Sequence, residues 1–216
     1  MKKVILIFYL ICFFLIIACG GSYAFTTVDS LQQRFCAVSG GDINVKLSAQ
    51  DIISCDKNDY GCDGGEIIYV WMYTSDYGVV DENCFPFSSE HGEVEECITE
   101  CKDGTEWYKY KAADYKFAFN IEAMKSAIAE RGPINSYFTV YEDFMNYKGG
   151  IYQHTEGEEV GGRYGNIVGF GNEGIMHFWI VQITLGPEWG ESGYVRMKFG
   201  ECGIDYEAMV ANPLIE

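Results

Sequence analysis

Apolar residues in the first part of the chain recur at helical spacing. Over 26–36 they fall at i, i+3 and i+7, which places them on one face of a helix: Val28, Leu31 and Phe35. Ser48 is a typical N-cap residue ahead of Ile52 and Ile53, and it predicts a second helix beginning there. A third amphipathic helix is predicted over 64–73. The first part of the protein is therefore expected to be helical.

The pattern changes in the second half of the chain. One helix is predicted over 121–130, where Gly132 and Pro133 end it. Beyond it, short apolar runs separated by glycines predict strands of an antiparallel sheet or barrel: 135–140, 166–169, 178–183 and 194–199. A helical half followed by a β half indicates an α+β chain of two lobes, which we expect at 19–105 and 106–216.

The first 18 residues differ from both lobes. Lys2 and Lys3 precede an uncharged apolar run over 4–18, which has the length expected of a secretory signal peptide. An uncleaved membrane anchor is one alternative, although a spanning helix needs roughly 20 apolar residues. A lipoprotein signal is another, because small and apolar residues precede Cys19. If this segment stays uncleaved, it is the only contact with a membrane that we expect.

Charge and cysteine content narrow the class of protein further. The chain carries 32 Asp and Glu against 15 Lys and Arg, a formal net charge of −17. Phosphate binding needs a basic patch, so nucleic acid is not an expected partner. Nine cysteines are many for 216 residues and indicate disulfides in an oxidising compartment, with metal sites as the alternative. The sequence thus predicts a protein of the secretory pathway.

Several ordered blocks resemble the papain-like cysteine peptidases, and their cathepsin B branch in particular. The blocks lie at 47–51, 61–65, 147–154, 161–162, 169–171, 188–194 and 202–204, together with Cys55. They span most of the chain after Cys19. The resemblance implies a papain-like two-lobe fold, with a helical left lobe, an antiparallel β-barrel right lobe and a cleft between them. It leaves open whether the C-terminal tail crosses back to the first lobe. The helix from Ser22 is expected to line the cleft.

In that family, a cysteine thiolate, a histidine base and an orienting asparagine carry out catalysis, and a glutamine before the cysteine helps to hold the oxyanion. All four residues are replaced in this chain. The block 19–25 places Ser22 at the position of the nucleophile. The family's Gly-Gly-His-Ala block, at 161–164 here, places Arg163 at the base. Ile183 stands at the asparagine position and Ile16 at the glutamine position.

Ser22 lacks the base that a serine nucleophile requires. Arg163 stays protonated in proteins, and Ile183 has no polar atom with which to orient a catalyst. We therefore expect an inactive peptidase homologue that binds a peptide or a protein in its cleft. Two alternatives remain: a residual peptidase that uses Ser22 with an unidentified base, and a truncated, non-functional gene product. Taken alone, Ser22 would be a helix N-cap.

The resemblance also implies a disulfide framework in the helical lobe. It pairs Cys19 with Cys62, Cys55 with Cys97, and Cys84 with Cys101, and it leaves Cys36 and Cys202 unpaired. These cysteine spacings match no zinc pattern, so we expect neither a metal nor another cofactor.

Part of the family's substrate cleft is also present. Gly64 and Gly65 match the wall whose backbone pairs with a bound peptide, where a ligand approaches too closely for a side chain. Glu207 matches the acidic floor of a pocket for a basic side chain, and its simpler interpretation is one surface acid among many. By the same resemblance, the protein is expected outside the cell or in a lysosome or vacuole.

Overall fold

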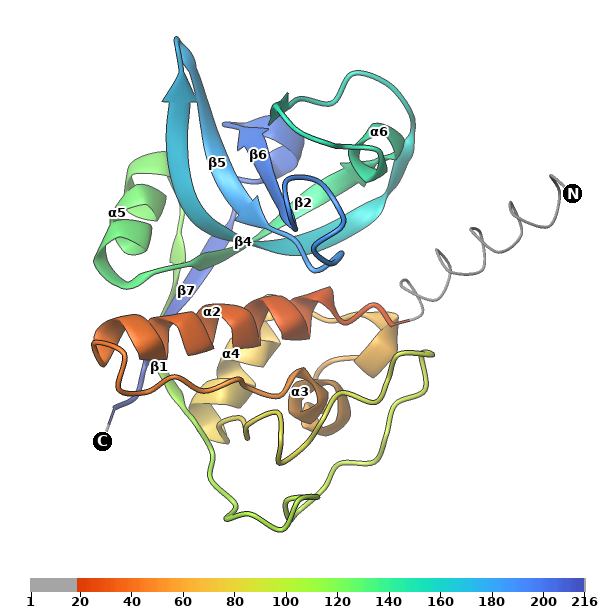
Figure 1. Ribbon diagram of the computed structural model, residues 1–216, viewed down its shortest axis with the longest axis vertical. Helices are drawn as coiled ribbons and strands as arrows, with labels where there is room; N and C mark the ends of the chain where they lie inside the picture. Colours follow the sequence, from red (N-terminus) through yellow and green to blue (C-terminus); the bar gives the residue numbers. More distant parts are fainter. Residues whose placement is uncertain (1–18, 216) are drawn as a thin grey trace, which may run out of the picture.

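A long central helix separates the two layers of the protein (Figure 1). The structure, a computed structural model, describes residues 19–215. The predicted leader over 1–18, which includes Ile16, lies outside the described residues. The elements in chain order are α2 (Ser22–Val38), α3 (Ala49–Cys55), η1 (Gly61–Asp63), α4 (Ile67–Asp76), β1 (Ala112–Ala118), α5 (Ile121–Arg131), β2 (Ile134–Tyr141), α6 (Glu142–Met145), β3 (Ile151–Tyr152), β4 (Glu159–Glu173), β5 (Met176–Gln182), β6 (Tyr194–Lys198), η2 (Glu201–Gly203) and β7 (Ala208–Pro213).

The first lobe contains the three helices that the periodicity predicts. The predicted face of α2 is buried with Trp71 of α4 and Ile52 of α3 in one core. Ser48 caps α3 as expected, since its hydroxyl accepts a hydrogen bond from the Asp51 N–H at 3.0 Å. α4 begins at Ile67 rather than at 64, because the preceding glycine pair is not helical and Gly64 has a φ of +115°. Ser22 is not an N-cap: Gly21 holds that position.

The three predicted disulfides are present, and all of them lie in the first lobe. They join Cys19 to Cys62, Cys55 to Cys97, and Cys84 to Cys101. Cys36 and Cys202 are unpaired among the described residues, as predicted. Bridges of this kind typically contribute roughly 2–4 kcal/mol each. Cys55–Cys97 and Cys84–Cys101 fasten the long segment between α4 and β1, whose course Figure 1 shows, and Cys19–Cys62 fastens the start of α2 to η1.

The second lobe is a seven-stranded sheet, which confirms the α+β class. The strand order is β1-β7-β2-β4-β5-β6-β3, and every pairing is antiparallel except that of β3 with β6. The expected barrel does not close, since no pairing within residues 19–215 joins β3 to β1. The reason lies at the two edges. β3 is two residues long, and Ala112, Met209 and Ala211 of β1 and β7 pack into the core of the first lobe instead.

Four of the seven strands differ from the predicted pattern: β4 in its length, and β1, β3 and β7 because they were not predicted. β4 extends over 15 residues where only 166–169 was predicted, because glycines interrupt its apolar pattern. β1 was not predicted at all, since four consecutive positions of it are exposed and show no alternation. Most remaining apolar residues of the lobe form a second core around Phe138, Ile167 and Trp179. The lobe boundaries at 105 and 106 stay a prediction. None of the helices in the described part of the chain is long and apolar enough to cross a membrane.

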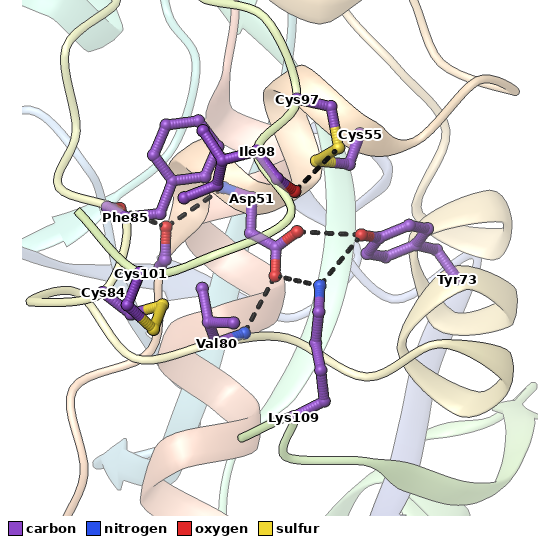
Figure 2. A network of polar contacts seen from close by, with 11 residues as sticks. Asp51, Cys55, Tyr73, Val80, Cys84, Phe85, Cys97, Ile98, Cys101 and Lys109 are labelled. Carbon is purple, nitrogen blue, oxygen red and sulfur yellow. Dashed lines mark hydrogen bonds and ion pairs between the residues drawn. A yellow bond between two sulfur atoms is a disulfide. The ribbon is translucent and has the colours of Figure 1, made fainter. Parts of the chain in front are cut away.

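A buried carboxylate joins the segments of the first lobe (Figure 2). Asp51 of α3 is fully buried. Its Oδ1 accepts the Tyr73 hydroxyl at 2.8 Å, and its Oδ2 accepts the Val80 N–H at 2.8 Å and Lys109 Nζ at 2.6 Å. These partners come from α4 and from the loops on either side of the Cys84–Cys101 bridge. One charged group thus fixes three segments far apart in the sequence.

We expect Asp51→Asn to lower the free energy of unfolding by about 3 kcal/mol, because it leaves the Lys109 ammonium without its anion in a mostly buried position. Urea denaturation with the disulfides intact measures the change. Lys109→Met in the same background is the matched control, and it should recover part of the loss. A loss that is unaffected by Lys109→Met would contradict this account of the network.

Two acidic side chains pack together beside the glycine pair. Oδ1 of Asp59 accepts the Glu66 N–H at 2.8 Å, while Oδ2 of Asp59 and Oδ2 of Asp56 are buried without a partner among the described residues. Burial and the charge of Asp56 raise the pKa of Asp59 to about 7, and burial also raises that of Asp56. A Cβ at Gly65 would lie 2.6 Å from the Asp59 carboxyl. The protonation state of this pair therefore changes the charge next to the backbone at Gly65 and Glu66.

We expect stability to fall as the pH rises from about 4 to about 7. Over that range the folded protein keeps a proton on Asp59 that the unfolded chain has lost, so rising pH favours unfolding. One proton contributes at most about 1.4 kcal/mol per pH unit, and the partial exposure of Asp59 reduces this value. Asp59→Asn should lessen the slope without abolishing it, because burial also raises the pKa of Asp29 to about 6. Thermal unfolding at several pH values is the measurement. The exposed Asp42→Asn is the control, and an Asp59→Asn slope equal to that of the parent protein would refute the assignment.

Candidate functional site

The start of α2 is fixed against the first lobe by a disulfide and a backbone hydrogen bond. Cys19 is bridged to Cys62, and the Gly20 N–H donates to the Cys62 carbonyl oxygen at 2.7 Å. A Cβ at Gly20 would lie 2.8 Å from that oxygen, so this approach requires glycine. Ser22 follows as the first residue of α2. Its position is therefore set by covalent and backbone contacts.

Ser22 lines a cavity of about 750 Å³ between the two lobes. Asp63 and Gly64 contribute to the same side of the cavity, and β2, α6 and β4 form the opposite side. The lining from the second lobe includes Glu142, Asn146, Gly161, Gly162 and Arg163. Three of the residues singled out from the sequence, Ser22, Gly64 and Arg163, thus meet at one cavity. Glu142 and Asn146 carry no motif and were not predicted.

Arg163 belongs to β4, where it lies opposite Phe138 of β2. Its Nη2 makes two long contacts to Thr184, at 3.5 Å to the carbonyl oxygen and 3.4 Å to Oγ1. Its Nε is buried and has no hydrogen-bond partner within the described chain. Burial lowers the pKa of the guanidinium, which nevertheless stays charged at neutral pH. Arg163 is therefore a permanent cation that cannot accept a proton.

Ile183 follows β5 and is buried in the second core, with 3% of its surface exposed. Its backbone N–H donates to the Gly193 carbonyl oxygen at 2.9 Å. The side chain is not part of the cavity lining. Ile183 therefore packs in the second core, and it is the residue that the resemblance aligns with the family's asparagine. The fourth replaced position, Ile16, lies outside the described residues.

The glycine pair forms the wall beside Ser22. Gly64 has a φ of +115° and no atom within 4 Å of the place where a Cβ would stand, so its outer face is open. Gly65 faces the interior instead, and a Cβ there would lie 2.6 Å from the ring of Tyr23. That ring is buried, and its hydroxyl donates to the Gly61 carbonyl oxygen at 2.8 Å. Only Gly64 of the pair lines the cavity.

Glu207 does not reach this cavity. Its side chain is exposed and borders a separate pocket of about 80 Å³, which Glu66, Tyr137 and Tyr164 also line. The Tyr164 hydroxyl donates to Glu66 Oε2 at 2.8 Å, and burial raises its pKa, so it stays a donor. Tyr164 packs edge-on against Tyr137, with 5.3 Å between the ring centroids. This tyrosine occupies the space between the lobes that a ligand side chain would need.

The sequence holds a signal for this tyrosine, because Tyr164 stands where the Gly-Gly-His-Ala block has alanine. A motif comparison that follows only the catalytic positions passes over it. The contact with Glu66, 98 positions away in the chain, is visible only in the fold.

The three histidines of the chain lie away from the cavity lining. His154 contacts Asp143 Oδ1 through Nδ1 at 3.1 Å and stacks on Tyr141. His177 is exposed and stacks on Phe199, and His91 is exposed. No described histidine is thus placed to act on Ser22. Within residues 19–215, no group of His, Cys, Asp or Glu side chains is arranged to hold a metal ion.

Comparisons with known proteins identify the family of this chain. The family model described as "Papain family cysteine protease" matches residues 16–212. Cathepsin B-like CP3 of Giardia intestinalis is 38% identical over 199 residues, which cover 88% of this chain and 66% of the relative. Cathepsin B-like cysteine proteinase 4 of Caenorhabditis elegans is 31% identical over 230 residues, which cover 91% and 69%.

The fold is likewise that of a solved relative. The structure of proCathepsin B S9 from Trypanosoma congolense matches with a TM-score of 0.86 at 30% identity, over 91% of this chain and 70% of the other. The chain spans about two thirds of the length of the curated relatives that it matches. The expected papain-like fold is confirmed, whereas the expected barrel is an open sheet. The chain belongs to the papain family of cysteine proteases, in its cathepsin B-like branch.

Proposed function

We propose that this protein binds a peptide, or an extended segment of another protein, in the cavity between its lobes without cleaving it. One observation carries the proposal: Ser22 and Arg163 face the same cavity at the positions of the family's nucleophile and base. A serine hydroxyl attacks a carbonyl carbon only when a neighbouring base removes its proton, and a guanidinium cannot do so.

The other ionisable groups at the cavity do not supply a base. Asp63 and Glu142 are exposed carboxylates, and no hydrogen bond within residues 19–215 joins Ser22 to either of them. The orienting position is occupied by buried Ile183, which has no polar side-chain atom. Loss of one member of such a catalytic set already costs orders of magnitude in rate. The chemistry at this cavity therefore favours binding over hydrolysis.

Binding needs none of the lost residues. The open face of Gly64 lets a ligand backbone approach closely, and an extended ligand can form main-chain hydrogen bonds along such a wall. The cavity is large enough for several residues of a peptide. The three disulfides of the first lobe fit an oxidising compartment. We therefore place the protein in the secretory pathway, with an extracellular, lysosomal or vacuolar destination.

We expect no hydrolysis of fluorogenic dipeptides by the parent protein. Ser22→Cys should also be inactive: the start of α2 and Arg163 favour a thiolate, but no group at the cavity protonates the leaving amine or activates the water that releases the acyl-enzyme. The triple variant Ser22→Cys, Arg163→His, Ile183→Asn should gain slow turnover, since it restores the chemical groups but not a matched environment. Hydrolysis rates at pH 5 to 8 test this, with circular dichroism and disulfide mapping to confirm folding. Turnover by the parent protein that is abolished by Ser22→Ala would overturn the proposal and establish a serine peptidase.

We expect Tyr164→Ala to open the pocket at Glu207. Removing the ring and its bond to Glu66 enlarges a space of about 80 Å³, so an arginine side chain of a bound peptide can enter and pair with a carboxylate. Calorimetry should then show tighter binding of a blocked Arg-containing peptide by Tyr164→Ala than by the parent protein, by about tenfold. Adding Glu207→Gln should reverse the gain. Tyr137→Phe keeps the ring in place and is the control. An unchanged affinity after Tyr164→Ala would remove Glu207 from the ligand site.

A further inference from the structure

The guanidinium of Arg163 is a cation without an anion. No carboxylate within residues 19–215 forms an ion pair with it, in contrast to Arg196, which pairs with both Glu173 and Glu191. Apart from two long contacts to Thr184, its donors have no partner in the described chain, and Nε is buried. A half-buried charge in this state has lost much of its hydration and has gained little in return. The residue lines the cavity, where a bound anion would supply the missing counter-charge.

The first turn of α2 adds a second source of positive potential at the same cavity. This helix is 17 residues long and begins at Ser22, with no side-chain cap and no acidic residue in its first turn. The first N–H groups of a helix have no acceptor within the helix, and the helix dipole favours negative charge beside them. Ser22 and Arg163 thus bring a hydroxyl, the start of α2 and a guanidinium to one space.

We propose that this space binds a carboxylate of the ligand. The inference rests on the proposed peptide binding and states which group is recognised. The carboxylate is either the C-terminus of an extended peptide or the side chain of an Asp or Glu within it. Arg163 binds it through charge-assisted hydrogen bonds from its fork, and the start of α2 contributes backbone donors. Replacement of the base by arginine therefore converts the site for peptide-bond cleavage into a site for anion recognition.

Two acidic residues oppose this interaction, as does the overall charge. Asp63 and Glu142 line the same cavity, and the protein's −17 slows the approach of an anionic ligand. Both side chains are exposed and already hydrated, so a cationic ligand gains little by pairing with them. Arg163 is half-buried and unpaired, and the same Coulomb interaction is stronger where water is excluded. The local cation therefore determines which ligand group is preferred.

Four blocked tripeptides test the inference by calorimetry and by thermal shift. Acetyl-alanyl-glycyl-alanine carries a free C-terminal carboxylate, and its C-terminal amide does not. Two further amides carry glutamate or glutamine at the central position and so separate a side-chain carboxylate from a terminal one. We expect the parent protein to bind at least one carboxylate peptide about tenfold more tightly than its neutral counterpart. Whichever pair shows the difference identifies the source of the carboxylate.

Three variants connect the preference to Arg163. Arg163→Gln should abolish it while leaving the neutral peptides unaffected, and it should not destabilise the fold, because it removes an unpaired charge. Arg163→Lys should keep only part of the preference, since an ammonium lacks the planar fork. Arg131→Gln makes the same change of charge at an exposed site in α5 and should leave the preference intact. If Arg163→Gln fails to fold, the comparison of Arg163→Lys with Arg131→Gln decides the matter.

The outcomes separate this inference from the proposed function. Equal binding of the acid and amide peptides would overturn carboxylate recognition and leave peptide binding standing. A preference that survives Arg163→Gln would remove Arg163 from the site. Absence of binding by all four peptides would count against both proposals, and cleavage of any of them would overturn the proposed function.

Discussion

The arrangement of both lobes depends on the hydrogen bonds that one face of α2 makes with the second lobe. Arg34 is almost completely buried there, and it donates from Nε to the Pro133 carbonyl oxygen at 2.7 Å and from Nη2 to the Gly132 carbonyl oxygen at 2.9 Å. Ser30 donates to the same Pro133 oxygen at 3.0 Å. The opposite face of α2 carries the apolar residues of the first core. α2 thus packs in the core of the first lobe through one face and binds the second lobe through the other.

The two arginines at this interface differ in how their charge is compensated. Backbone carbonyl oxygens surround the guanidinium of Arg34, so burial lowers its pKa only to about 10 and leaves it charged. Arg163 has no such oxygens beyond its long contacts to Thr184. Burial of a charge is tolerated where polar groups replace the lost water. By that criterion the charge of Arg34 is compensated in the free protein, whereas the charge of Arg163 would be compensated only by a bound ligand.

The sequence predicts those features that depend on short segments or on covalent chemistry. Helical spacing identifies α2 and α4, the Ser48 cap identifies α3, and Gly132 with Pro133 marks the end of α5; the family resemblance identifies all three disulfides. Features that depend on contacts between distant segments are not predicted. The open edge at β1 follows from packing against the first lobe, and the closed pocket at Glu207 follows from the contact between Tyr164 and Glu66. The hydrophobic periodicity of one segment does not show which distant segment it packs against.

The Cys19–Cys62 bridge gives the cavity a chemical restriction of its own. Cys19 lines the cavity, and the bridge ties the first turn of α2 to η1. In a reducing medium this covalent tie would be lost, and the turn that presents Ser22 would be held by the Gly20 hydrogen bond and by the buried Tyr23 side chain with its bond to Gly61. A ligand would then have to order that turn when it binds, and the conformational entropy lost in doing so would lower its affinity. Reduction of the Cys19–Cys62 bridge would therefore weaken ligand binding at this cavity without changing Ser22 or Arg163.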